Sequence, residues 1–254
     1  MRSITTSLDH GAAKGATDIF GRPVTSKLAG ISIPMPKRLA GQLLTGFDDA
    51  ALEMILGAGR ERTFAASQTL FRTGEPAERL FMLRKGSVRF SRVSDGGREV
   101  VMGVLVSGDI CGLGSLLTSP ISYYGTAVAI EASEMVVWNH AVLQKLAADY
   151  PLLSQNALHV ALNYIAHFID RQLRLASSTA EQRLAGTLIS LGTRSGNITP
   201  NGVELTVTNE LLASLADVSP FTTSRAMQTW SRSGAIVKSR GRLRITAPEK
   251  LLLS

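Results

Sequence analysis

Residues 208–245, TNELLASLADVSPFTTSRAMQTWSRSGAIVKSRGRLRI, predict two short helices joined by a tight turn and followed by a β-hairpin. The first helix has leucines on one face, and Asp217-Val218 forms the turn. Ser219 is a good N-cap and Pro220 suits the first helical position, so the second helix should begin here and stop at Gly234. The alternating residues after Gly234 then predict a hairpin. Together these elements predict a winged helix-turn-helix.

Basic side chains concentrate in this stretch, since no acidic residue lies between Asp217 and Glu249. Arginine can form two hydrogen bonds with a guanine edge, so Arg225 is expected to read bases while its polar neighbours contact bases or phosphates. A solvated helix surface remains the alternative, above all for Gln228 and Arg232. The predicted contacts with double-stranded DNA are Ser219, Pro220, Phe221, Thr222, Ser224, Arg225, Gln228, Arg232, Lys238, Arg240 and Arg242.

Upstream, residues 63–138 consist of short apolar or alternating runs separated by glycine-bearing turns. Such regular spacing is typical of an antiparallel sandwich or barrel. Asp95-Gly96-Gly97 is a hairpin signal because glycine tolerates positive φ angles. A short helix over about residues 47–56 should cap this barrel. The strands are expected at residues 80–83, 87–93, 99–106, 126–130 and 135–138.

A long helix is predicted from about Leu152 to Leu175, after a shorter helix that Asn139 caps and Pro151 ends. One apolar stripe along it has the spacing of a coiled-coil seam, which indicates a homodimer. A second stripe, Ala161, Tyr164 and Phe168, should pack on the barrel. The alternative, one amphipathic helix lying on its own domain, leaves one stripe exposed. The predicted dimer interface is Leu158, Leu162, Ile165, Ile169 and Gln172.

The predicted fold class is therefore α+β: an N-terminal antiparallel β-roll or jelly-roll barrel, a long dimerisation helix and a C-terminal winged helix-turn-helix. Ser177-Ser178-Thr179 breaks the long helix, and Thr179 or Ser178 can cap the helix that follows. The predicted boundaries are 1–36 for a flexible extension, 37–150 for a sensor barrel, 151–176 for the dimerisation helix and 177–254 for the winged helix-turn-helix.

Composition limits the class of protein. The chain has 254 residues, a formal charge of +7 and a pI near 9.9, which favour an anionic partner. Its single cysteine, Cys111, excludes an internal disulfide framework and fits a reducing cytoplasm. No stretch reaches the roughly 18 uninterrupted apolar residues of a membrane span, and we see no signal sequence. We expect a cytoplasmic protein with no membrane partner.

Several motifs carry a resemblance to a known family. They are Arg72-Thr73-Gly74-Glu75-Pro76-Ala77, Leu80-Phe81-Met82-Leu83, Lys85-Gly86-Ser87-Val88, Gly108-Asp109-Ile110-Cys111-Gly112, Glu210 to Ala216, Ser219 to Arg225, and Ser233-Gly234-Ala235-Ile236. In this order and spacing the chain resembles the Crp/Fnr family of bacterial transcription regulators from about Phe47 to Ile245. The resemblance implies a cyclic-nucleotide-binding-type barrel with allosteric control, a homodimer on a pseudo-palindromic operator, and RNA polymerase as a further partner.

The resemblance also assigns roles within the recognition helix. It places Arg225 at the family's base-reading arginine and Ser224 at the serine used by the fumarate-nitrate branch. Phe221, however, stands where a base-contacting glutamate is usual, so we do not expect the common family operator in full. A phenyl ring cannot accept a hydrogen bond from cytosine but can meet a thymine methyl. Packing of Phe221 on the preceding helix is the alternative.

Cyclic AMP is not the expected effector. The family holds its phosphate with a glutamate and an Arg-Ser pair, but the corresponding segments here, residues 112–115 and 123–126, contain no arginine. Where adenine-contacting hydroxyls would project, this chain has Phe168 and Ile169. We expect an apolar effector pocket instead. Its predicted lining is Leu113, Gly114, Ser115, Tyr123, Tyr124, Thr126, Tyr164 and Phe168.

Other effector chemistries remain open. The cysteine cluster of an iron–sulfur sensor is missing, and haem would need His140, His159 or His167 as an axial ligand. Cys111 could sense oxidation, although its apolar run favours an inert thiol. A constitutive DNA-binding regulator, or a haem- or redox-based gas sensor, are the alternatives. We expect no protein metal site and no enzyme, because residues 63–138 contain no histidine for a metal-dependent barrel enzyme.

Overall fold

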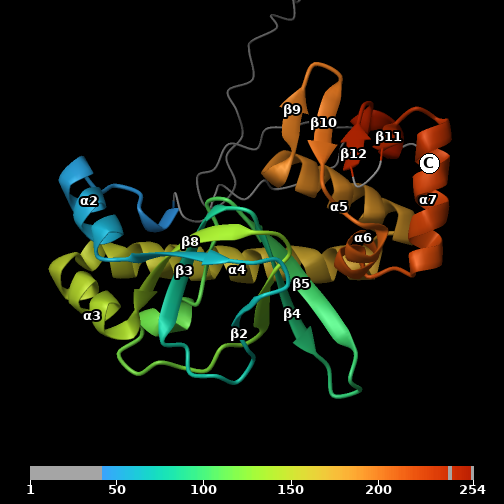
Figure 1. Cartoon of the computed structure of the whole chain (residues 1–254). Coiled ribbons are helices and arrows are strands. Elements are labelled where there is room, and N and C mark those ends of the chain that lie inside the picture. Colours follow the sequence, from blue (N-terminus) through green and yellow to red (C-terminus); the bar gives the residue numbers. More distant parts are fainter. Residues whose placement is uncertain (1–41, 240–241, 253–254) are drawn as a thin grey trace, which may run out of the picture. The chain divides into compact units, whose positions relative to one another are not determined.

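The computed structural model describes residues 42–239 and 242–252. The predicted extension over 1–36 therefore lies outside the described residues. The described chain begins with the short helix α2, continues through the strands β1 to β8 and the helices α3 and α4, and ends with three helices and a small sheet (Figure 1). This order of elements confirms the predicted fold class.

Within the part of the chain that the structure describes, eight strands form the N-terminal barrel, in two four-stranded antiparallel sheets ordered β1-β8-β3-β6 and β2-β7-β4-β5. Asp95-Gly96-Gly97 lies in the β4–β5 hairpin, as predicted, and Gly97 has a φ of 76°. The strands are β1 (Arg60–Phe64), β2 (Thr69–Phe71), β3 (Arg79–Lys85), β4 (Ser87–Val93), β5 (Glu99–Val106), β6 (Ile110–Cys111), β7 (Thr126–Ala129) and β8 (Ser133–Asn139). A 3-10 turn, η1 (Leu113–Leu116), follows β6.

Aromatic side chains fill the interior between the two sheets. Tyr123 stacks on Phe71 with ring centroids 3.9 Å apart, and Phe81 packs against Phe71 at 5.5 Å. The Tyr123 hydroxyl donates to the carbonyl of Arg79 and accepts from the amide of the same residue. Since the buried phenol has a hydrogen-bond partner on each side, this core can retain a polar group at little cost.

Of the helices with described bounds, three cover the outer face of the β1-β8-β3-β6 sheet: α2 (Asp49–Gly57), α3 (His140–Asp149) and α4 (Pro151–Ser177). Asn139 caps α3 by accepting from the amide of Val142, as predicted. Trp138 donates to the carbonyl of Ile55, and buried Asn156 donates to the carbonyls of Leu43 and Thr45. The Trp138 bond holds α2 on β8, and the Asn156 bonds hold the segment before α2 on α4. In Figure 1, α4 runs alongside the strands.

The C-terminal elements surround a second core in which Leu188, Met227 and Trp230 are buried. The elements are α5 (Ala180–Ser195), β9 (Asn197–Thr199), β10 (Gly202–Leu205), α6 (Asn209–Ala216), α7 (Pro220–Arg232), β11 (Ile236–Ser239), β12 (Arg242–Ile245) and the 3-10 turn η2 (Pro248–Leu251). The strands of this C-terminal part form one sheet with the order β11-β12-β10-β9. Helix α6, the turn and α7 followed by the β11–β12 hairpin form the predicted winged helix-turn-helix. Among the described helices, none is both long and apolar enough to cross a bilayer.

Candidate nucleic-acid interface

The start of α7 is fixed by local hydrogen bonds. Asp217 ends α6 in the left-handed region with a φ of 51°, which turns the chain sharply. The Ser219 hydroxyl accepts from the amide of Thr222 at 3.0 Å, and Pro220 occupies the first turn. The Thr223 hydroxyl donates to the Ser219 carbonyl. Because these bonds hold the first turn, the helix presents its next residues in a defined direction.

Helix α7 has one buried face and one exposed face. Thr223, Ala226, Met227 and Trp230 are buried in the C-terminal core. On the other side Arg225 and Gln228 are exposed, and Thr222 and Ser224 are partly exposed. The predicted anchor residues and the predicted contact residues thus lie on different faces, which is the arrangement that a groove-reading helix requires.

Phe221 is 76% exposed beside the exposed Ser219 and Pro220. Packing on the preceding helix, the alternative considered for this ring, does not occur. A large aromatic side chain that remains in solvent on an otherwise polar face is available to a partner. This position therefore offers an apolar side chain beside the exposed polar ones.

The β11–β12 hairpin, which forms the wing, carries fewer unpaired cations than the sequence suggested. Arg244 of β12 lies opposite Glu204 of β10 and forms an ion pair with it at 2.7 Å, and Arg242 lies 3.8 Å from the same carboxylate. Lys238 donates to the side chain of Asn209. No acidic residue interrupts this stretch along the chain, but antiparallel pairing brings Glu204 beside it across the sheet.

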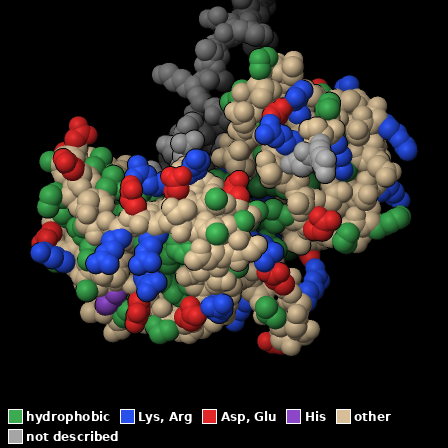
Figure 2. Space-filling model, in the orientation of Figure 1, with side chains coloured by type: hydrophobic (Ala, Val, Ile, Leu, Met, Phe, Trp, Pro, Cys, Tyr) green, Lys and Arg blue, Asp and Glu red, His purple; other side chains and the backbone are tan. Residues whose placement is uncertain are grey.

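Arg232 is exposed in the last turn of α7, whereas Arg240 lies outside the described residues. In Figure 2, Lys and Arg side chains are spread over the surface of the C-terminal elements. Exposed cations there are suited to phosphate contacts.

The exposed face of α4 is apolar. Leu158, Leu162, Ile165 and Ile169 are between 46% and 60% exposed, and Gln172 is exposed at the end of this stripe. The opposite face of the helix, with Leu153 and Val160, is buried against the barrel. A stripe of large aliphatic side chains in solvent on a barrel-bound helix indicates a protein interface.

The eight residues predicted to line an effector pocket lie in several different surroundings. Leu113 and Tyr164 pack in the core beneath α4, where the Tyr164 hydroxyl donates to the Ile110 carbonyl. Tyr123 belongs to the core between the sheets, and Tyr124 and Phe168 are exposed. Ser115 is buried and donates to the carbonyl of Gly112. Gly114 and Thr126 are partly buried.

Phe168 was predicted to pack on the barrel but is exposed, and helix geometry gives the reason. Positions four apart on a helix drift about 40° around its axis at each step. The stripe that begins with buried Val160 and continues through Tyr164 has therefore turned away from the barrel at Phe168.

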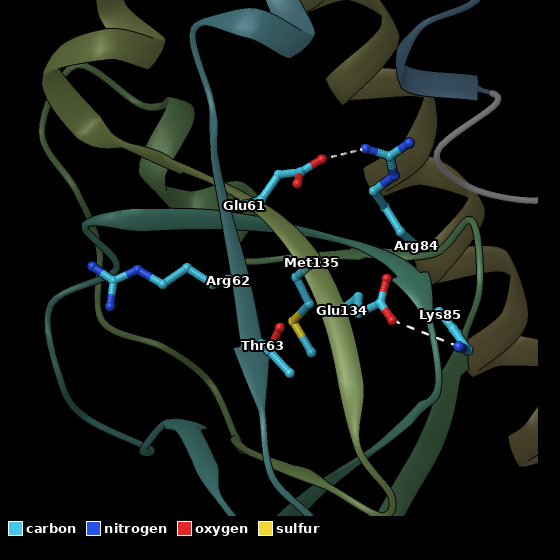
Figure 3. Close-up of a pocket in the computed structure, with 7 residues that line it drawn as sticks. All are labelled: Glu61, Arg62, Thr63, Arg84, Lys85, Glu134 and Met135. Carbon is cyan, nitrogen blue, oxygen red and sulfur yellow. Dashed lines mark hydrogen bonds and ion pairs between the residues drawn. The ribbon is translucent and has the colours of Figure 1, made fainter.

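A surface pocket of about 480 Å³ lies elsewhere, over β1, β3 and β8 (Figure 3). Its walls are charged: Arg84 pairs with Glu61 at 2.7 Å and Lys85 with Glu134 at 3.6 Å. The lining residues are Glu61, Arg62, Thr63, Arg84, Lys85, Glu134 and Met135. None of them was among the predicted effector contacts, since nothing in their sequence pattern marks a binding site.

The histidines and the cysteine are dispersed. The His140 ring is hydrogen-bonded at Nδ1 to the Ser115 carbonyl, and His159 is exposed on α4. Within the described residues no three His, Cys, Asp or Glu side chains group as a metal site would require. Burial, assisted by the charge of Asp109, raises the pKa of the Cys111 thiol well above its usual range. A thiol held protonated is a poor nucleophile.

Comparison with known families identifies the chain. Residues 61–150 match the cyclic nucleotide-binding domain, and residues 182–253 match the Crp-like helix-turn-helix domain. The chain belongs to the Crp/Fnr family of transcription regulators. Crp/Fnr regulators act through DNA binding, and the helix-turn-helix described above is the element that this family uses for it.

Similar Crp/Fnr proteins include Electron transport regulator A of Shewanella oneidensis, 26% identical over 179 residues, 70% of this chain and 71% of the relative. Transcriptional activator protein FnrA of Stutzerimonas stutzeri is 25% identical over 211 residues, 82% of each chain. Among solved structures, FixK2 from Bradyrhizobium japonicum has a TM-score of 0.68 at 19% identity, covering 77% of this chain and 96% of that one. The c-di-GMP-responsive regulator CLP of Xanthomonas campestris has a TM-score of 0.66 at 22% identity, covering 78% and 99%. The two structures share the fold.

Proposed function

We propose that this Crp/Fnr protein is a cytoplasmic, homodimeric regulator that binds a specific pseudo-palindromic DNA sequence and has no enzymatic activity. The division of α7 into a buried apolar face and an exposed face with Arg225 supports this proposal most strongly. Two recognition helices in a symmetric dimer would enter successive major grooves, about 34–36 Å apart. The domain boundaries that fit this function are 37–150, 151–176 and 177–254.

Within the interface, Arg225 is proposed to read guanine, and Ser224, Thr222 and Gln228 to contact neighbouring bases or phosphates. Phe221 supplies an apolar contact such as one to a thymine methyl. Arg232, Lys238, Arg240 and Arg242 are proposed to contact phosphates. Ser219 and Pro220, at the start of α7, complete the proposed DNA contacts.

The exposed aliphatic stripe of α4 is proposed as the homodimer interface. A second copy of the same helix would cover it in a two-fold arrangement, since an isologous contact pairs equivalent apolar residues. RNA polymerase is the further partner that this function implies, because a bound regulator changes transcription by recruiting or blocking it.

The effector is proposed to be other than cyclic AMP. Residues 112–115 and 123–126 hold no arginine for a phosphate, and an anion buried without a cation is costly. A regulator that binds DNA constitutively, with no small-molecule effector, is the second candidate. The stacking of Tyr123 on Phe71 favours it, because these rings fill the barrel interior. An absorption spectrum of the purified protein tests the haem alternative at His140, His159 or His167.

Selection of bound duplexes from a random DNA pool tests the proposed function. We expect an enriched sequence with two-fold symmetry, bound with an affinity that falls steeply as salt rises. Enrichment of no sequence would refute the proposal. Repeating the selection with each candidate effector present separates the regulated version from the constitutive one, because only a regulated protein changes affinity.

A further inference from the structure

The guanidinium of Arg183, in the first turns of α5, bonds to carbonyls from two separate segments. Its Nη1 donates to the carbonyl of Ser178 at 2.8 Å. Its Nε donates to Ala216 at 3.0 Å and its Nη2 to Asp217 at 3.1 Å. All three nitrogens of one planar group are therefore engaged with backbone.

These carbonyls lie at the ends of two different helices. Ser178 is the C-cap of α4, and Ala216 and Asp217 end α6. The last carbonyls of a helix have no partner within it, so donors from elsewhere must satisfy them. Arg183 does so for two helices at once. It thereby connects the end of α4 to the turn that leads into α7.

The planar fork makes this connection rigid. An arginine holds its donors in a fixed geometry, whereas a lysine is a single flexible charge and cannot hold three carbonyls in one plane. Ala216 and Asp217 cannot shift relative to Ser178 without losing at least one of the bonds. Only Val218 and Ser219 lie between this turn and the first residue of α7.

A second arginine holds the same turn from the barrel. Arg98, in the β4–β5 hairpin, donates to the carboxylate of Asp217 at 3.0 Å. This pair is exposed, so alone it contributes little. It acts on the side chain of the residue whose carbonyl Arg183 binds, and it restrains the turn in the same position.

We propose that Arg183 is a positioning residue that fixes the angle between α4 and α7, and so sets the separation of the two recognition helices in the dimer. The inference rests on the proposed function, because it concerns two copies of α7 on one DNA site. A regulator whose helices are held at one separation accepts one half-site spacing, since a mismatch in spacing must then strain protein or DNA. A regulator with loosened helices tolerates several spacings.

The DNA arm of the test compares Arg183→Met, Arg183→Lys and the matched control Arg174→Met, an exposed arginine in the last turn of α4. Each is titrated with the selected operator, with operators whose half-sites are one base pair closer or farther apart, and with a single half-site. We expect the preference for the selected spacing to fall about fivefold or more in both Arg183 variants. The half-site affinity should stay within about twofold of the unsubstituted protein, and Arg174→Met should keep the full preference.

The second arm needs no DNA. A spin label at Thr229→Cys, exposed on α7, in a Cys111→Ser background reports the distance between the two recognition helices of the dimer. We expect a narrow distance distribution that broadens in Arg183→Met and Arg183→Lys but not in Arg174→Met.

Three results would overturn the inference: an unchanged spacing preference in Arg183→Met, an equal loss of affinity on every duplex, or a distance distribution that stays narrow. An equal loss would assign Arg183 to stability alone. If the protein selects no duplex, the proposed function fails, and the spin-label arm still decides whether Arg183 positions α7.

Discussion

Arg194 of α5 donates a hydrogen bond to the carboxylate of Asp109, whose side chain is only 3% exposed. The same carboxylate accepts from the amide of Val106 at 2.9 Å and so closes the turn between β5 and β6. The barrel's buried charge thus depends on a cation from the first helix after α4. A buried carboxylate that loses its cation retains the cost of leaving water without compensation.

Arg194→Met should therefore lower the free energy of unfolding by about 3 kcal/mol, measured by urea denaturation. Asp109→Asn combined with Arg194→Met should recover part of the loss, because the buried charge is then gone while the amide oxygen can still accept from Val106. Losses that simply add in the double variant would show that the two side chains do not interact.

The buried Cys111 thiol predicts that the stability of the folded protein depends on pH. Burial raises the pKa of this thiol in the folded protein, while an unfolded thiol has a pKa of about 8.5. The unfolded chain therefore releases this proton first, and stability present below pH 8.5 should decline above it, by at most about 1.4 kcal/mol per pH unit. Urea denaturation at pH 7.5, 9 and 10 measures the decline, and Cys111→Ala should reduce it. Rapid reaction of the native thiol with iodoacetamide at pH 8 would contradict the account.

The exposed stripe of α4 predicts a loss of dimer on charge insertion. Ile165→Glu should convert the protein to monomers in sedimentation experiments, because two buried carboxylates would face each other across the seam. The control His159→Glu adds the same charge at an exposed position on another face of α4 and should remain dimeric. Dimers of Ile165→Glu would place the interface elsewhere.

Substitutions of Arg225 and of Arg242 should affect DNA binding in different ways. Arg225→Ala should weaken binding to the selected operator by about 1–3 kcal/mol and relax the base preference at one position, while Arg242→Ala should weaken all sequences more evenly. Competition binding with single-base operator variants measures both. If Arg225→Ala loses equal affinity for the operator and for random DNA, its role as a base reader is refuted.

Helix caps and hydrophobic periodicity, which can be read from the sequence, were enough to predict the helices of this fold. Asn139, Thr179 and Ser219 each cap the helix that was expected to follow, because capping depends on a side chain and an amide three residues away. The long helix was recognisable from its periodicity, although it runs from Pro151 to Ser177 rather than from Leu152 to Leu175.

Strands with weak hydrophobic patterns were missed. β1 (Arg60–Phe64) is a charged edge strand, and β9 (Asn197–Thr199) has one apolar residue, Ile198, which is 86% exposed. Edge strands need little apolar periodicity, because much of their surface stays in water.

Contacts between distant segments could not be derived from the sequence. The pairing of Arg244 with Glu204 depends on strand register, and the position of Phe168 depends on accumulated helix rotation. The hydrogen bonds from Arg183 to the ends of α4 and α6 require these two helix ends to lie close together. The helical pattern around Arg183 does not predict them.

Footprinting of the selected operator at single-nucleotide resolution tests most directly whether one α7 from each half of a two-fold assembly enters the DNA. The account predicts two equivalent protected major-groove segments whose centres lie about 10–10.5 base pairs apart, with Arg225→Ala reducing protection in both. A single protected segment, or protection confined to the minor groove, would contradict it.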